Sequence, residues 1–314
     1  MLDLSNQIVM FLHVVEASGF SAASRKLGLT PSAVSKKVSR LEDHFNVRLL
    51  NRSTRGVSLT ENGRIFYDHA KKIANDLRGL EELAVSMAGN VQGTLRAVAS
   101  VAFGKSQLMP LIPAFLERYP ELQLNLELSD RPVDLAAEGL DVAILFTEQI
   151  TDHAAVMRKL ATVRRFLCAS AEYIDKYGAP ETPLALLEHN CLRVSTVAHW
   201  NDWQVNALGE NEREHASGNF QTNSADAIYH AVLAGLGVAQ LSDYLLAEDL
   251  KTGKVVQILP DLINSRSDIV AIFPDRRNLS PNVRAFIDYL VEHFQPVPPW
   301  ERGHPSLSAI EKAA

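Results

Sequence analysis

Residues 21–43 read Ser21-Ala-Ala-Ser-Arg-Lys-Leu-Gly28-Leu-Thr30-Pro31-Ser-Ala-Val-Ser-Lys-Lys-Val-Ser-Arg-Leu-Glu-Asp43, and they decide the fold of the first part of this 314-residue chain. A short helix runs into a turn at Gly28. A second helix begins at once, with Thr30 placed as its N-cap and Pro31 as its first residue. Two helices joined by so short a turn are typical of a helix-turn-helix.

The second helix has one apolar and one polar face. Val34, Val38 and Leu41 recur at spacings of four and three, which is the pattern of a helix that buries one side. The opposite side carries small hydroxyls and cations, with no carboxylate before Glu42. Because phosphates edge the major groove of DNA, this face is suited to a helix that reads bases through its first turns.

Charge is distributed unevenly along the chain. The formal net charge is −6, whereas residues 1–60 hold eight Lys and Arg against four Asp and Glu, a net of +4. The other 254 residues therefore carry −10. A basic head on an acidic body indicates a polyanionic partner for the head alone.

Residues 1–60 are predicted to form a three-helix head with a wing. The first helix covers about residues 4–17, and two short strands surround a turn at residues 54–56 that carries a cation. The predicted core of the head consists of Ile8, Phe11, Val15, Ala22, Leu27, Val34, Val38 and Leu41.

The residues expected to contact DNA are hydroxyls, cations and one proline ring on the second helix and the wing. Any one of them alone is equally well explained as a solvated side chain. Thr30, Pro31, Ser35 and Lys36 are expected near base edges, Ser32, Lys37, Ser39 and Arg40 at phosphates, and Arg52 and Arg55 at the backbone or minor groove.

Residues 61–89 are predicted to be a linker helix that pairs two chains. Apolar residues recur at alternating spacings of four and three over three heptads, which favours packing of one helix against another. The alternative is a helix lying on its own domain. The predicted dimer seam consists of Phe66, Ala70, Ile73, Leu77, Leu80, Ala84 and Met87.

From Thr94 onward the pattern alternates between strands and helices, which predicts a largely parallel sheet, or two of them. Strands are expected near residues 95–100, 122–128, 140–146, 156–169, 191–195, 213–220, 236–241, 254–259 and 268–273. Helices are expected near 105–118, 132–138, 171–177, 183–188, 224–235, 243–250 and 280–294. The tail of residues 296–314 shows no periodicity and is expected to be loosely ordered.

The whole pattern resembles the LysR-type transcriptional regulators. The specific part of the match is Leu27-Gly28 followed by residues 30–35, then Leu49-Leu50-Asn51-Arg52 and residues 59–63. The resemblance implies a multidomain α+β protein: a winged helix-turn-helix at 1–60, a linker helix at 61–89, and an effector domain at 90–295. That domain would resemble type 2 periplasmic binding proteins, with subdomain I at 94–164 and 268–295, subdomain II at 165–267, and two crossover strands between them.

The same resemblance implies the partners and the mode of action. Double-stranded promoter or operator DNA would be bound by a homodimer or homotetramer, with RNA polymerase as a further candidate partner. A small effector, polar or carboxylated, would close the two subdomains and reorient the linker helices, which requires different affinity for two states.

Ligands of open α/β sheets bind beyond the carboxyl ends of strands, where hydroxyls and amides of this chain gather. The resemblance places Ser100 and Thr147 on facing edges of the cleft, whereas Ser129, Asp130 and Ser224, each taken alone, are better explained as helix caps. The candidate effector residues are Ser100, Val101, Ala102, Phe103, Ser129, Asp130, Phe146, Thr147, Ser195, Thr196, His199, Trp200, Asn223 and Ser224.

Other classes of protein are less well supported. An enzyme, a metal site or a cofactor lacks its motif: there is no phosphate loop, no His-Glu-x-x-His, and Gly235-Leu-Gly237 is only a fragment of a dinucleotide fingerprint. A solute-binding protein lacks an export signal here and would not need a basic head. Cys168 and Cys191 fit a reducing compartment and are expected in the core rather than in a redox switch. With no apolar run of about 20 residues, a cytoplasmic protein is expected.

Overall fold

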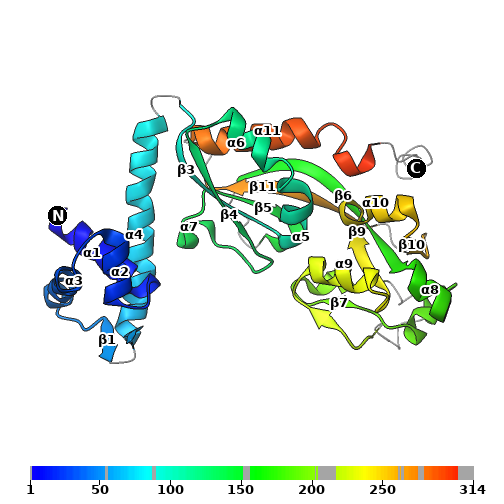
Figure 1. Cartoon of the computed structure of the whole chain (residues 1–314), viewed down its shortest axis with the longest axis horizontal. Helices are drawn as coiled ribbons and strands as arrows, with labels where there is room; N and C mark the ends of the chain where they lie inside the picture. Colours follow the sequence, from blue (N-terminus) through cyan, green and yellow to red (C-terminus); the bar gives the residue numbers. More distant parts are fainter. Residues whose placement is uncertain are drawn as a thin grey trace. The chain divides into compact units, whose positions relative to one another are not determined.

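The computed structural model describes residues 2–53, 56–86, 90–150, 156–201, 203, 217–260, 262, 265–274 and 279–302 (Figure 1). The chain divides into two compact units. The first comprises Met1–Ala88 with Asp134–Gly139, and the second comprises Gly89–Val133 with Leu140–Ala314.

The first unit begins with helices α1 (Leu2–Glu16), α2 (Phe20–Leu27) and α3 (Pro31–Phe45). Gly28 ends α2 in the left-handed conformation at φ 64°, which glycine adopts without strain. The Thr30 hydroxyl accepts a hydrogen bond from the Ala33 N–H at 3.3 Å, and Pro31 opens α3. The predicted helix-turn-helix, its cap and its first residue are therefore confirmed.

The wing is a two-stranded antiparallel hairpin of β1 (Leu50–Ser53) and β2 (Gly56–Leu59). Its predicted tip residue Arg55 lies outside the described residues. The helices and the wing enclose a core that contains the fully buried Phe11, Val34, Val38 and Leu41, with Ala23 buried in place of the predicted Ala22.

The predicted dimer seam lies on helix α4 (Glu61–Ser86), where one part of it is packed in the head and another part is exposed. Phe66 and Ala70 pack into the core of the head, where Phe66 meets Phe11 edge to face at 5.5 Å. Ile73 and Leu77 are 45% and 40% exposed. The head alone explains the first two seam positions, so among the seam residues with described side chains Ile73 and Leu77 call for another partner. The side chains of Leu80 and Ala84, and all of Met87, lie outside the described part.

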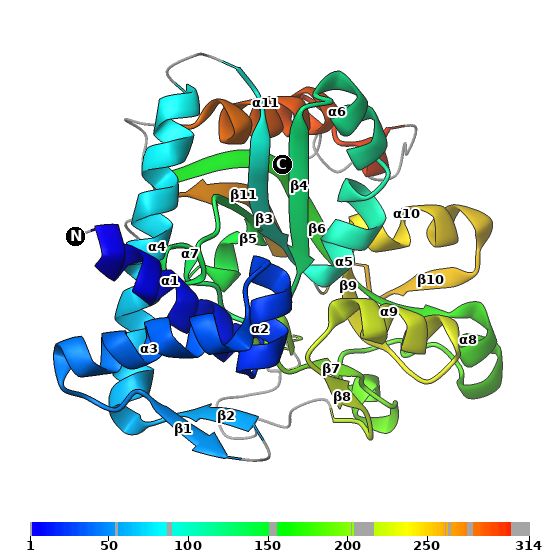
Figure 2. The same ribbon diagram turned by 60° about the vertical axis from the view of Figure 1, so that its left-hand side comes forward.

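The second unit is built on a seven-stranded mixed sheet (Figure 2). Strands β3 (Gly93–Ala99), β4 (Leu122–Leu128) and β5 (Val142–Phe146) run parallel, with β3 in the middle. The long strands β6 (Val156–Ser170) and β11 (Ser265–Phe273) pair antiparallel with each other, and β11 pairs antiparallel with β5. The prediction of a largely parallel sheet is therefore wrong for this part of the chain.

Strand β6 joins two lobes of the second unit. Its first half pairs with β11, and its second half pairs with β9 (Ala239–Ser242) on one side and β10 (Val255–Ile258) on the other. The strand region predicted near residues 156–169 is thus one continuous strand of 15 residues. A further parallel pair is formed by β7 (Arg193–Val194) and β8 (Gln221–Thr222).

Helices cover both lobes. The first lobe carries α5 (Val101–Phe103), the π-helical turn η1 (Gly104–Leu108), α6 (Ile112–Arg118), η2 (Thr147–Gln149) and α11 (Pro281–Phe294). The second carries α8 (Ala171–Tyr177), the 3₁₀ helices η3 (Leu184–Glu188) and η4 (Ala198–Asn201), α9 (Ala225–Leu233) and α10 (Asp243–Thr252). The short helix α7 (Leu135–Glu138) lies in the segment that is grouped with the first unit.

Several predicted elements differ from the observed ones for local reasons. The helix predicted at 105–118 is broken, because Pro110 has no N–H to donate and its ring clashes with the preceding turn. The helix predicted at 132–138 begins only at Leu135, after its cap Asp134. Residues 217–220 of the strand predicted at 213–220 are not in a strand, and pairing starts at Gln221.

The start of the carboxy-terminal tail is packed, contrary to the prediction of loose order. Residues Pro299–Glu301 form the 3₁₀ helix η5, and Trp300 is only 4% exposed. Its ring lies against Phe103, Tyr244 and Phe294 at 5.7–6.1 Å between centroids. Among the helices that the structure describes, none is long and apolar enough to span a membrane.

Candidate functional sites

A groove on the first unit is lined by the turn after α1, helix α2, the start of α3 and the wing. It encloses about 1150 Å³, open to solvent. Four predicted DNA residues, Pro31, Ser32, Ser35 and Arg52, line it, and so does Arg25, which the sequence analysis did not single out. The groove therefore brings hydroxyls and cations from four segments to one concave surface.

Arg52 is the centre of a hydrogen-bond network that joins the wing to α3. Its guanidinium donates to the hydroxyls of Ser35 and Ser39 and to Glu42 Oε2, each at 3.0 Å. It also lies 5.0 Å over the ring of Phe20. The other oxygen of Glu42 accepts the N–H groups of Leu49 and Leu50 at 2.8 and 3.0 Å. Arg52 thus ties the wing to α3 through three hydrogen bonds.

Most of the other predicted DNA residues are exposed, although the Thr30 hydroxyl is engaged by the Ala33 N–H and by the Ser32 hydroxyl. Thr30, Ser32, Lys36 and Arg40 are exposed. Lys37 is half-buried, because its ammonium donates to Asn6 Oδ1 at 2.8 Å.

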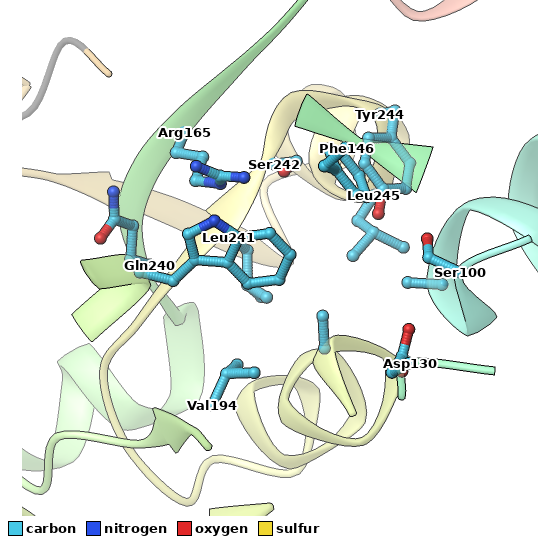
Figure 3. A pocket seen from close by; sticks show the side chains of 13 residues that line it. Ser100, Asp130, Phe146, Arg165, Val194, Gln240, Leu241, Ser242, Tyr244 and Leu245 are labelled. Carbon is cyan, nitrogen blue, oxygen red and sulfur yellow. The ribbon is translucent and has the colours of Figure 1, made fainter. Parts of the chain in front are cut away.

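A pocket in the second unit lies between the two lobes, beside the middle of β6 (Figure 3). It encloses about 420 Å³ of space not filled by atoms, part of it open to solvent. Five of the fourteen predicted effector residues line it: Ser100, Ala102, Asp130, Phe146 and Trp200. The other lining residues were missed, and they are Arg165, Val194, Ala225, Gln240, Leu241, Ser242, Tyr244 and Leu245.

The remaining predicted effector residues do not line this pocket. Phe103 is 1% exposed and belongs to the core behind it, and the Val101 N–H donates to Asp130 Oδ1 at 3.0 Å. Ser129 and Ser224 are half-buried beside the pocket, and Thr196 is half-buried outside it. Thr147, Ser195 and Asn223 are exposed. The side chain of His199 lies outside the described residues.

Arg165 brings a buried positive charge to the pocket wall. It is 5% exposed, its Nη1 pairs with Glu148 Oε1 at 3.0 Å, and its guanidinium stacks over Trp200 at 4.4 Å. Burial alone would raise the pKa of Glu148, but the Ser267 hydroxyl and the Arg165 charge outweigh that effect and lower the pKa. A sequence signal existed, since Arg164-Arg165 stands directly before the apolar run Phe166-Leu-Cys-Ala169 of the same strand.

Asp130 brings a carboxylate to the facing side. Burial raises its pKa, and the Val101 N–H and the Ser224 hydroxyl offset that rise only in part. Asp130 Oδ1 therefore accepts the Val101 N–H at the start of α5, while Asp130 Oδ2 is available to the pocket.

The two cysteines are buried and free. Burial raises the pKa of Cys191 to about 12 and that of Cys168 further. Because the thiolate is the reactive form, both thiols are poorly suited to redox sensing. In the part of the chain that the structure describes, no group of three His, Cys, Asp or Glu side chains is placed to hold a metal ion.

Two sequence families match the chain. Residues 5–64 match the family described as bacterial regulatory helix-turn-helix protein, lysR family, and residues 88–295 match the LysR substrate binding domain. The HTH-type transcriptional activator TtdR of Escherichia coli is 32% identical over 91% of this chain and 92% of its own length. The HTH-type transcriptional regulator DmlR of the same species is 33% identical over 93% of this chain and 95% of its own.

A solved structure supports the same relationship. CrgA, a LysR-type transcriptional regulator from Neisseria meningitidis, superposes with a TM-score of 0.60 at 30% identity, covering 91% of this chain and 97% of its own. The helix-turn-helix and the second unit thus both fall within regions that match relatives along nearly the whole length. The chain belongs to the LysR-type transcriptional regulators, DNA-binding proteins with an effector-binding second domain.

Proposed function

We propose that the chain regulates transcription without catalysis, by coupling occupancy of the pocket beside β6 to the way its head grips an operator. The observation that carries this proposal is the composition of the pocket wall. Ser100 and Asp130 come from one lobe, and Val194 and Gln240 come from the other. A ligand that contacts both lobes binds their closed arrangement more tightly and shifts the equilibrium toward it.

On the DNA side, we propose that Thr30, Pro31, Ser35 and Lys36 read bases. Ser32, Lys37, Ser39, Arg40 and Arg55 would contact phosphates or the minor groove, together with Arg25 from the groove. Ser35 and Ser39 accept hydrogen bonds from Arg52, yet a hydroxyl that accepts one bond still donates another. Arg52 itself acts mainly by holding the wing.

We further propose that the chain works as a homodimer, or a pair of dimers, in the cytoplasm. Each base contact discriminates by only about 1–3 kcal/mol, so two heads are needed for specific binding. The exposed Ile73 and Leu77 supply an apolar contact for a second copy of α4. The working division is a head at 1–60, a linker helix at 61–89, an effector domain at 90–295 and a tail beyond it.

The test is genome-wide footprinting with the purified full-length protein at two salt concentrations. We expect protected sites with two half-sites about one helical turn apart. Lys36→Ala should weaken these sites selectively, while Lys26→Ala, an exposed cation at the end of α2, should change them little. A protein that prefers no genomic fragment over random competitor would overturn the proposal.

A further inference from the structure

Five of nine buried side-chain polar atoms that have no hydrogen-bond partner within the described part of the chain belong to this one pocket. They are Ser100 Oγ, Asp130 Oδ2, Arg165 Nη2, Trp200 Nε1 and Gln240 Oε1. Folded proteins pair nearly all buried polar atoms, because leaving one unpaired is costly. The concentration of such atoms on one small wall indicates a ligand that pairs with them.

The unpaired atoms differ between the two ends of the pocket. Figure 3 shows Arg165 and Gln240 at one end, and Ser100 with Asp130 at the other. Arg165 Nη2 and Trp200 Nε1 are obligate donors. A flip of the Gln240 amide adds a third donor, and Ser265, which now accepts from Gln240 Nε2 at 3.2 Å, tolerates the flip because its hydroxyl also donates. This end is therefore suited to a carboxylate.

The opposite end requires a donor from the ligand. Asp130 Oδ1 already accepts the Val101 N–H, and Oδ2 is the atom without a partner. The Ser100 hydroxyl beside it both donates and accepts. A second ligand carboxylate placed here would meet the Asp130 carboxylate, and like charges at close range repel.

The net charge of the pocket wall also favours a ligand with a single carboxylate. Glu148 pairs with Arg165 Nη1 and compensates its positive charge, so that Arg165 offers the ligand only the hydrogen-bond donors of Nη2. With Asp130 included, the ionised wall has no surplus of positive charge to attract a dianion. A ligand with a single carboxylate and a hydroxyl or ammonium group satisfies both ends.

We infer that this pocket binds a small monocarboxylic acid by its two ends: the carboxylate on Arg165 Nη2 and Trp200 Nε1, and a hydroxyl or ammonium donor on Asp130 Oδ2 beside Ser100. The inference rests on the proposed function of the pocket as an effector site. It goes beyond it by assigning the charge pattern of the ligand and by making Asp130 the residue that rejects dicarboxylates.

Calorimetric titration of the full-length protein with a matched series tests this assignment. The series is 4-hydroxybutyrate, 4-aminobutyrate, butyrate, succinate and butylamine, with the three- and five-carbon homologues of each. At one chain length we expect the hydroxy or amino acid to bind at least tenfold tighter than the plain acid and the diacid, and the amine not to bind. The hydroxy and amino arms distinguish the two donors.

Two pocket variants and one control make the result specific. Arg165→Gln should weaken every carboxylate at least tenfold. Asp130→Asn replaces the acceptor by an amide that also donates, so it should weaken the hydroxy or amino acid at least tenfold and strengthen the diacid. Asp175→Asn makes the same chemical change on the exposed face of α8 and should alter nothing. Unliganded thermal unfolding of each variant checks its fold.

Three outcomes would overturn the inference: no binding by any member of the series, equal binding of diacid and hydroxy acid, or tight binding that survives both pocket substitutions. Each is independent of the footprinting experiment. Specific footprints with a failed ligand series reject the ligand assignment alone, whereas absent footprints reject the proposed function and leave a measured ligand preference standing.

Discussion

The head and the ligand pocket are built on opposite principles. In the head, polar side chains near the groove are paired with each other: Arg52 alone bonds to Ser35, Ser39 and Glu42. In the pocket, Arg165 and Asp130 each keep one atom unpaired among the described residues. On the roles proposed above, DNA would meet an exposed surface whose side chains are already paired, while a small molecule would meet a buried wall that its own polar groups complete.

The largest expected effect on DNA binding concerns helix α4, which carries the exposed part of the predicted dimer seam. Leu77→Asp places a charge on an exposed apolar position of α4, so a dimer that packs there should separate. Loss of the second head should then weaken specific DNA binding by at least about a hundredfold, since one head forfeits half of the contacts. Sedimentation and gel-shift assays measure the two effects.

The matched control for that variant is Ile65→Asp on the same helix. Ile65 is 59% exposed but does not fall on the heptad seam, so the dimer should persist. An intact Leu77→Asp dimer, or equal disruption by both substitutions, would show that α4 does not pair through this seam.

The contrast between the two sites also explains what the sequence could predict. Gly28, Thr30 and Pro31 act within a few residues of their own positions, so the helix-turn-helix and its cap were predicted correctly. The seam pattern was ambiguous, because Phe66 and Ala70 repeat at the right spacing whether the partner is another chain or the head's own core.

The pocket depends on contacts that no local pattern contains. Ser100, Asp130 and Phe146 follow strand ends and were found in that way. Gln240 and Tyr244 reach the pocket only because β9 pairs with the far half of β6, an antiparallel pairing that the alternating pattern did not predict. Trp300 was assigned to a loose tail, since three residues of 3₁₀ helix leave no periodicity to detect.

The next effect tests whether the pocket wall depends on residues beyond the matched family region, which ends at residue 295. Trp300 supports Phe103 and Tyr244 from behind. Trp300→Ala should destabilise the second unit by about 3–5 kcal/mol, as large-to-small changes in cores do. Val297→Ala removes a 44% exposed side chain from the same segment and should cost little. Denaturant unfolding followed by circular dichroism compares the two; equal midpoints would mean that the tail supports nothing.

A smaller effect depends on pH and should belong to the second unit alone. Asp243 is fully buried, and desolvation, aided by Glu301, raises its pKa to about 7, while the N–H groups of Arg164 and Tyr244 oppose the rise. Between the pKa of Asp243 in the unfolded chain, about 4, and its pKa of about 7 in the folded chain, Asp243 is protonated in the folded state and ionised in the unfolded state. Stability from this group is complete below about pH 4 and is lost as the pH rises to about 7, by up to about 4 kcal/mol.

Comparison of wild type with Asp243→Asn checks this sign. The asparagine cannot ionise, so thermal unfolding of the variant should lose the decline between about pH 5 and about pH 7 that we expect for the wild type. Parallel curves for the two proteins would show that Asp243 does not carry a proton in the folded state. The head's DNA affinity at fixed pH should be the same in both.

The smallest expected effect distinguishes a residue of the head that positions the wing from one that contacts DNA directly. Arg52→Ala removes the three hydrogen bonds that hold the wing, and we expect binding to every DNA sequence to weaken by about tenfold, or about 1.4 kcal/mol. Because its guanidinium is already engaged by the protein, the salt dependence of binding should keep its slope. Arg25→Ala, which removes an exposed cation in the same groove, should instead reduce the slope by about 0.9.

Arg52→Lys sharpens this distinction further. Lysine keeps the positive charge but lacks the planar fork that reaches Ser35, Ser39 and Glu42 together. If Arg52 positions the wing, lysine should restore little of the lost affinity. If lysine restores binding, or if Arg52→Ala lowers the slope as Arg25→Ala does, then Arg52 contacts the DNA backbone directly. The paired character of the head's polar groups would then be a property of the free protein that binding to DNA reverses.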